Sequence, residues 1–148
     1  MRKPVRVLAI IAGSIAGVLC LIFLIAWGVA RSKLNTTYAV PAVHFKAPAP
    51  DSQIADRGAK LATMHACTHC HGPDMGGSVM ASGPFVGALV PPNLTRSPAG
   101  IGRRLTDEDW ARAVRHAVNR QNKPLLLMPG EHSYADMSDE DLGAIVAY

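Results

Sequence analysis

Cys67-Thr68-His69-Cys70-His71 is the most informative stretch of this 148-residue sequence. Two thiols three positions apart can each form a thioether with one of the two vinyl groups of a haem. The residue after the second cysteine, His71, is then held beneath the porphyrin, where its imidazole can bind the iron from the proximal side. This C-x-x-C-H pattern is the attachment signature of c-type haem. The sequence therefore predicts one covalent haem c per chain.

Two other interpretations of the cysteine pair fit the sequence less well. A thioredoxin-like dithiol should lie in a βαβ context, which the surrounding pattern does not provide. A structural zinc site needs a second pair of ligands, and the remaining cysteine, Cys20, lies in the apolar N-terminus. We therefore favour haem c.

Residues 7–30 form an apolar stretch without a charged side chain. At about 1.5 Å per residue, a helix of this length spans roughly 36 Å, enough to cross a hydrocarbon core of about 30 Å with some tilt. Gly28-Val29-Ala30 resembles a signal cleavage site. The stretch is nevertheless longer than the roughly 7–15 residues of a signal-peptide core. We expect residues 1–33 to be an uncleaved, single-pass membrane anchor.

The charges beside this stretch predict its orientation. Three basic residues precede it and two follow it. By the positive-inside rule the N-terminus should be cytoplasmic, which places the main domain on the periplasmic side of a bacterial inner membrane. Gly13 and Gly17 form a G-x-x-x-G step that would let the anchor pack on another membrane subunit. Small residues are also common in such helices without this role.

Residues 34–50 are predicted to be a proline-rich linker, with Pro41, Pro48 and Pro50 and no helical periodicity. An extended stretch rises about 3.1 Å per residue, so it would hold the following domain as much as ~50 Å from the bilayer. Residues 51–148 are predicted to be that domain. It is too small to have a thick apolar core of its own, and a haem would supply the missing apolar mass.

The domain is predicted to be all-α, with three main helices and no convincing strand. The first helix should run from Asp51 or Ser52 to Cys70. The second and third should begin after Thr106 and Ser138, because each hydroxyl residue is followed three positions later by an acid, close to a capping box. Helical spacing continues through residues 114–118 and 145–148. The intervening residues 72–102, rich in Pro and Gly, should form a loop around something apolar.

The second axial ligand of the iron would decide the chemistry. Met128 follows an apolar run and precedes Pro129-Gly130, and a loop thioether suits iron as a soft ligand. His132, four residues later, is the main rival. Met137 is better explained by packing on Leu142 as a hydrophobic staple. Three further candidates are disfavoured by closeness to His71 or by a solvated helix face: Met75, Met80 and His116.

With these residues the chain resembles class I c-type cytochromes. It is most similar to bacterial membrane-anchored monohaem members that serve dehydrogenases or the respiratory chain. The resemblance covers about residues 56–148, in family order. The matching segments are Arg57-Gly58, residues 67–71, Pro92-Asn93-Leu94-Thr95, Gly100-Ile101-Gly102, residues 105–110, residues 124–129 and residues 138–148.

The resemblance implies roles for particular residues. It makes Met128 the distal ligand and places Pro92, Asn93 and Thr95 in a loop that lines the haem. It also implies that the first and last helices of the domain cross, with Gly58 against Tyr148. The family's last helix usually continues beyond the position of Tyr148, a departure that an incomplete or truncated sequence would explain.

The expected function is electron transfer. Ligation by His71 and Met128 would leave no open site on the iron, which suits an electron carrier rather than an enzyme. We expect it to relay electrons from a dehydrogenase or quinol-oxidising complex to a downstream acceptor, with redox proteins and the membrane as partners and no small-molecule substrate. Two alternatives stay open: an open-site haem protein that senses a gas or reduces peroxide, and an accessory assembly subunit of a membrane redox complex.

Seven of the nine Lys and Arg residues of the domain fall within residues 96–123. A basic face could steer an acidic redox partner, and Arg103 or Arg104 could pair with a haem propionate. Alternatively, most of these side chains form a solvated helix face. No nucleic-acid partner is expected, since the sequence has no binding motif or interleaved aromatic residues.

Overall fold

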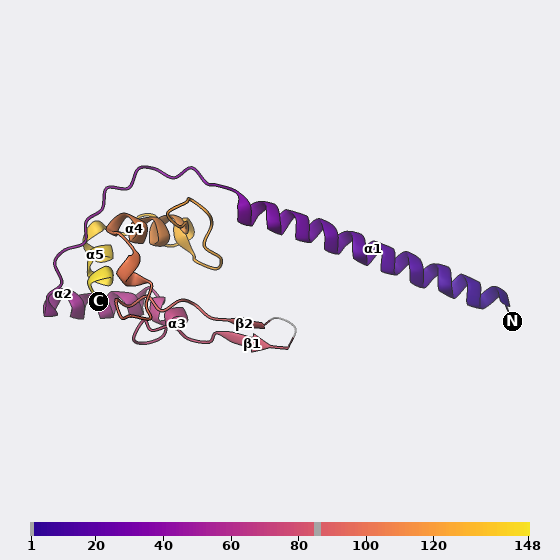
Figure 1. The fold of residues 1–148 in the computed structure, drawn as a ribbon, viewed down its shortest axis with the longest axis horizontal. Helices are drawn as coiled ribbons and strands as arrows, with labels where there is room; N and C mark the ends of the chain where they lie inside the picture. The colour runs from indigo at the N-terminus through magenta and orange to yellow at the C-terminus, as the bar shows by residue number, and fades with distance from the viewer. Residues whose placement is uncertain (1, 85–86) are drawn as a thin grey trace.

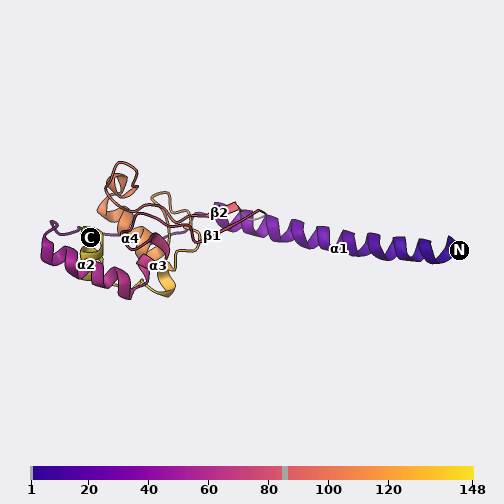
Figure 2. The same ribbon diagram turned by 90° about the horizontal axis from the view of Figure 1, so that it is seen from below.

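The computed structural model describes residues 2–84 and 87–148. One long helix leads away from a smaller group of helices (Figure 1), and the view turned by 90° shows the same arrangement (Figure 2). Helix α1 (Arg2–Asn35) contains the apolar stretch and is exposed along its described length. By length and composition it is the one helix among the described residues that could cross a membrane, and a signal sequence near the N-terminus would pass the same criteria.

The part of the chain after the linker is built around the crossing of helices α2 (Ser52–Met64) and α5 (Asp139–Ala147). Gly58 has no side chain at the crossing, and a β-carbon there would run into the Ala144 carbonyl and lie 2.9 Å from the Tyr148 β-carbon. The predicted contact of Gly58 with Tyr148 is therefore confirmed. The chain is mostly helical, as the predicted fold class requires.

The first predicted helix is wrong at its end. Helix α2 ends at Met64, and Ala66 adopts the left-handed conformation with φ 58°. Because this conformation cannot continue a right-handed helix, the chain changes direction. The attachment motif then forms a separate short helix, α3 (Cys67–His71).

Helix α4 (Asp107–His116) begins as its sequence predicts. The Thr106 hydroxyl accepts from the Asp109 N–H at 3.2 Å, and the Asp109 carboxylate accepts from the Thr106 N–H at 2.9 Å. This reciprocal pair confirms the capping box. The helix ends earlier than predicted because Ala117 is left-handed, with φ 50°. Val118 is nevertheless buried and pairs with Pro124 in an isolated β-bridge.

The expectation of no strand was also wrong. Strands β1 (Ala81–Gly83) and β2 (Gly87–Leu89) pair in antiparallel register, with Ser82 opposite Ala88. Each strand has three residues, too few for a recognisable period-2 pattern. Two short 3-10 helices, η1 (Gly102–Arg104) and η2 (Gly130–His132), complete the described elements.

Part of the predicted linker packs onto the domain. Val43 and Phe45 are 8% and 5% exposed and belong to one core cluster with Ala111 of α4 and Leu142 of α5. The Ala47 N–H donates to the Asp107 carboxylate at 3.0 Å. Figure 1 shows the segment passing from the end of α1 across α4 and α5. The prediction of a free spacer is therefore wrong for residues 38–48, which we call the docked segment.

Candidate functional site

Cys67 and Cys70 lie at the two ends of one helical turn in α3. Residues three apart lie on the same side of a helix, so both thiols are available to a single group. Both side chains are half-buried and neither forms a disulfide. Cys67 packs beside a buried cluster that contains Ala62, Met75 and Ile145. Burial raises the pKa of the Cys67 thiol, which keeps it protonated at neutral pH.

The imidazole of His71 is oriented by a backbone carbonyl. Its Nδ1 lies 3.0 Å from the carbonyl oxygen of Pro92. Because a carbonyl only accepts, Nδ1 must carry the proton and donate, and Nε2 of the neutral ring then keeps a free lone pair. Metal-binding histidines are commonly fixed in this way. The structure thus brings together two of the predicted site residues, His71 and Pro92.

Gly77 allows the 91–93 backbone to approach the motif, a role that the sequence reasoning missed. The Gly77 N–H donates to the His71 carbonyl at 2.7 Å. Gly77 has φ 89°, and a β-carbon there would lie only 2.9 Å from the Pro91 carbonyl oxygen. Both the backbone conformation and the close approach favour glycine. The G-G step at residues 76–77 was the available sequence signal.

Asn93 and Thr95 bind each other and shape their loop. The Thr95 N–H and hydroxyl donate to the Asn93 side-chain oxygen at 2.9 and 2.7 Å. The Asn93 carbonyl accepts from the Ile101 N–H at 2.9 Å. These bonds give both residues a role in holding the loop beside Pro92. Their contact with a haem stays a prediction.

Met128 is half-buried in the turn between α4 and η2. The turn is seated on the end of α4: the Leu125 N–H donates to the Ala117 carbonyl at 2.7 Å, and buried Gly130 packs directly on Ala117. The ligand role of Met128 stays a prediction.

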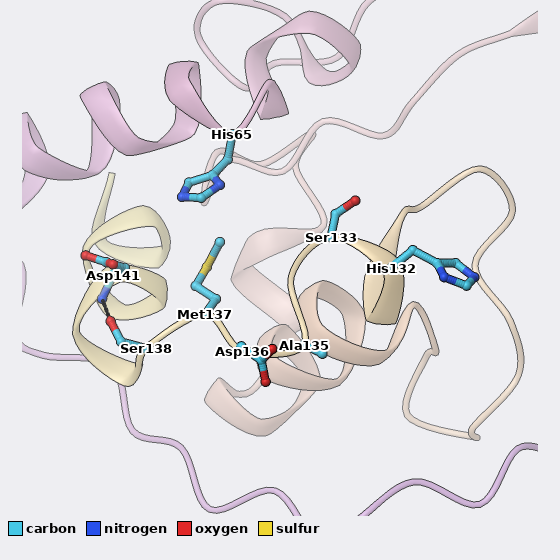
Figure 3. Close-up of a pocket in the computed structure, with 8 residues that line it drawn as sticks. All are labelled: His65, His132, Ser133, Ala135, Asp136, Met137, Ser138 and Asp141. Carbon is cyan, nitrogen blue, oxygen red and sulfur yellow. Dashed lines mark hydrogen bonds between the residues drawn. The ribbon is translucent and has the colours of Figure 1, made fainter.

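The positions of the rival ligands can be compared. Met137 packs against the core cluster that contains Leu142, as a staple would. It also lines a cleft of about 430 Å³, where it points toward His65 (Figure 3). His132 is exposed, and Figure 3 shows its ring turned away from Met137. His116 is half-buried with its Nδ1 atom inaccessible to solvent, so the predicted solvated position is wrong.

Two of the basic side chains that could have formed a solvated face bind other residues of the domain. Arg115 donates to the Met137 carbonyl at 3.0 and 2.7 Å and pairs with Asp139 at 2.7 Å. Arg120 pairs with Asp109 at 2.7 Å. Arg103 and Arg104 are exposed. Because acidic residues of the same domain partly neutralise Arg115 and Arg120, these two side chains contribute less positive charge for steering a redox partner.

The donor set fits a c-type haem better than a bare metal ion. The described residues contain no group of three or more His, Cys, Asp or Glu side chains that could hold a metal ion. Two thiols on one helical turn, directly followed by a histidine with a free Nε2, match the attachment and proximal ligation of haem c.

Comparison with known proteins agrees with this geometry. The alcohol dehydrogenase (quinone) cytochrome c subunits of Gluconacetobacter polyoxogenes and Komagataeibacter europaeus are each 31% identical over 106 residues, 68% of this chain and 22% of the relative. The gluconate 2-dehydrogenase cytochrome c subunit of Pantoea cypripedii is 36% identical over 101 residues, 64% of this chain and 22% of that relative. The chain thus spans about a fifth of the length of these relatives. No solved structure matches.

The family comparison covers most of the haem domain. The family described as cytochrome C oxidase, cbb3-type, subunit III matches residues 53–148. This range contains the attachment motif, the Pro92 loop and Met128, and it confirms the resemblance predicted from the sequence. The chain therefore belongs to this cytochrome c family, which implies haem c and electron transfer.

Proposed function

We propose that the chain carries electrons through one haem c held by Cys67, Cys70, His71 and Met128. The observation that carries the proposal is the orientation of His71 by the Pro92 carbonyl, directly after the two thiols of α3. This arrangement supports a fixed proximal ligand on a covalently attached haem. Haem c supplies an iron that alternates between two oxidation states, so it accepts and donates single electrons.

Each residue has a defined task in this proposal. Cys67 and Cys70 would each form one thioether, which holds the cofactor permanently on α3. His71 would donate its Nε2 lone pair, while the Pro92 carbonyl prevents its ring from rotating. Met128 would supply its thioether sulfur as the second protein ligand to the iron, which would raise the reduction potential relative to a second histidine.

The proposed partners follow from the relatives. Two kinds of dehydrogenase have cytochrome c subunits similar to this chain. We infer that this chain accepts electrons from a dehydrogenase or a quinol-oxidising complex and passes them to a downstream acceptor. With both axial positions filled it would bind no substrate, and it would act as a carrier or subunit rather than as an enzyme.

We further propose that α1 stays attached as a membrane anchor, with the haem domain on the periplasmic side of a bacterial inner membrane. The basic excess before the apolar stretch supports this orientation. Gly13 and Gly17 lie four residues apart in α1, and this G-x-x-x-G step would allow a helix of another subunit to approach closely.

The axial ligand set provides the test. Met128→Ala should keep the covalent haem but weaken the long-wavelength sulfur-to-iron absorption, lower the potential and admit carbon monoxide. Met137→Leu is the matched control, because it removes a thioether that packs in the core, and it should change none of these properties. Ready binding of carbon monoxide by the unaltered protein would instead support a gas sensor or peroxidase.

A further inference from the structure

Tyr134 connects two segments that are far apart in the sequence. Its hydroxyl donates to the backbone carbonyl of His65 at 2.6 Å. The two rings also meet edge to face, with centroids 5.8 Å apart and planes at 83°. His65 directly follows α2 and lies two positions before Cys67. Tyr134 therefore contacts the segment that leads directly into the attachment motif.

The backbone of Tyr134 is hydrogen-bonded to Gly130, the residue at which the turn that carries Met128 ends. Its N–H donates to the Gly130 carbonyl at 2.7 Å, and the Ser133 N–H donates to the same oxygen at 3.0 Å. Gly130, two residues after Met128, packs closely on Ala117. Met128 is thus connected to Tyr134 through the backbone from Met128 to Gly130 and the hydrogen bond between Gly130 and Tyr134. The Tyr134 side chain in turn contacts His65.

The hydroxyl is well suited to this contact. Carbonyls at the end of a helix lack intrahelical partners, and the His65 carbonyl accepts from the Tyr134 hydroxyl at 2.6 Å and from the Cys67 thiol at 3.9 Å. Burial raises the pKa of Tyr134, which keeps the hydroxyl protonated and able to donate. In Figure 3 the His65 ring points from the end of α2 toward Met137, which lies in the same connection to α5 as Tyr134.

We propose that Tyr134 is a positioning residue for the distal ligand: its hydroxyl ties the Met128 turn to the segment carrying Cys67 and thereby keeps the Met128 sulfur on the iron. The inference rests on the proposed ligand role of Met128. Without the hydroxyl bond, the turn keeps its attachment to α4 but is freer to move relative to α3. An external ligand then displaces Met128 more readily.

Imidazole binding to the oxidised, full-length protein in detergent tests this inference. Tyr134→Phe removes one oxygen and keeps the ring, and imidazole should bind about fivefold more tightly, the factor that one ordinary hydrogen bond contributes. The sulfur-to-iron absorption should also weaken at lower temperature than in the unaltered protein, with the haem still covalently bound.

Tyr148→Phe is the matched control. The Tyr148 hydroxyl also donates to a backbone carbonyl, that of Pro73 at 2.8 Å, but Tyr148 does not belong to the Met128 turn. It should lose a similar hydrogen bond without changing imidazole affinity. Equal imidazole affinities for Tyr134→Phe and Tyr148→Phe would overturn the inference.

Two further variants show whether a negative result concerns the ligand role of Met128 or the role of the Tyr134 hydroxyl. If Met128→Ala binds imidazole no better than the unaltered protein, the ligand assignment fails and the inference fails with it. If Met128→Ala binds tightly but Tyr134→Phe does not, only the role of Tyr134 fails. His65→Ala keeps the acceptor carbonyl and removes the ring, so it should retain normal affinity. Tighter imidazole binding by His65→Ala would assign the effect to ring packing and overturn the role of the hydroxyl.

Discussion

Replacing Phe45 with alanine tests whether the docked segment is part of the folded domain. The Phe45 side chain is 5% exposed and packs with Val43, Ala111, Leu142 and Val146. Truncating a buried phenylalanine to alanine typically costs about 3–5 kcal/mol, because it removes apolar contacts and leaves a cavity. Phe45 lies on the outer side of a thin core, where neighbours can relax, so we expect a loss near 3 kcal/mol. That is a large part of the roughly 5–15 kcal/mol that stabilise a domain.

The loss can be measured by urea unfolding of the haem-loaded protein, followed by haem absorbance and circular dichroism. With a slope of about 2 kcal/mol per molar urea, 3 kcal/mol moves the midpoint down by about 1.5 M. The Arg115 guanidinium lies 5.9 Å from the Phe45 ring centroid, so part of the loss is a cation–π contact.

His44→Ala is the control for this measurement. His44 is exposed on the opposite side of the same stretch, and its removal should change stability by no more than about 0.5 kcal/mol. If Phe45→Ala costs as little as His44→Ala, the segment is the free spacer that its proline content suggested. The packing argument would then be refuted.

Three further predictions concern attachment, pH and the membrane. Replacing both Cys67 and Cys70 with serine should abolish covalent haem, and haem that resists acid–acetone extraction in this variant would contradict the proposed attachment. Burial raises the pKa of Asp109, but bonds from the Thr106 backbone and hydroxyl and the Arg120 charge outweigh it and leave the pKa below its usual value. Asp109 thus stabilises the fold above about pH 4 and loses this effect as pH falls, so Asp109→Asn should destabilise the protein most near neutral pH, as unfolding at several pH values would reveal. The full chain should stay with membranes after a carbonate wash, whereas a mature protein beginning near Arg31 would indicate a cleaved signal.

Features encoded by adjacent residues could be predicted from the sequence. The attachment motif and the capping box at Thr106 depend on spacings of a few residues, which the chain geometry converts directly into contacts. The long apolar helix is equally local, because length and composition determine it.

The docked segment was missed although the sequence carried a signal. Val43, Phe45 and Ala47 alternate with His44 and Lys46, the period expected of an extended stretch with one buried side. The neighbouring prolines suggested a spacer instead. Composition describes how a segment behaves alone, and it does not reveal that α4 and α5 offer an apolar surface.

The contacts around the site explain why its assembly was harder to predict than its motif. His71, Arg115, Tyr134 and Tyr148 each bind a backbone carbonyl, those of Pro92, Met137, His65 and Pro73 respectively. Every residue has a backbone carbonyl, so the type of the acceptor residue does not matter. The sequence therefore contains no pattern that would reveal which carbonyl is bound. Such bonds suit a small domain with a thin core, because one polar side chain can join two loops without requiring a complementary partner. It follows that substitution of the donor should disturb the site, whereas most substitutions of the acceptor residue should not.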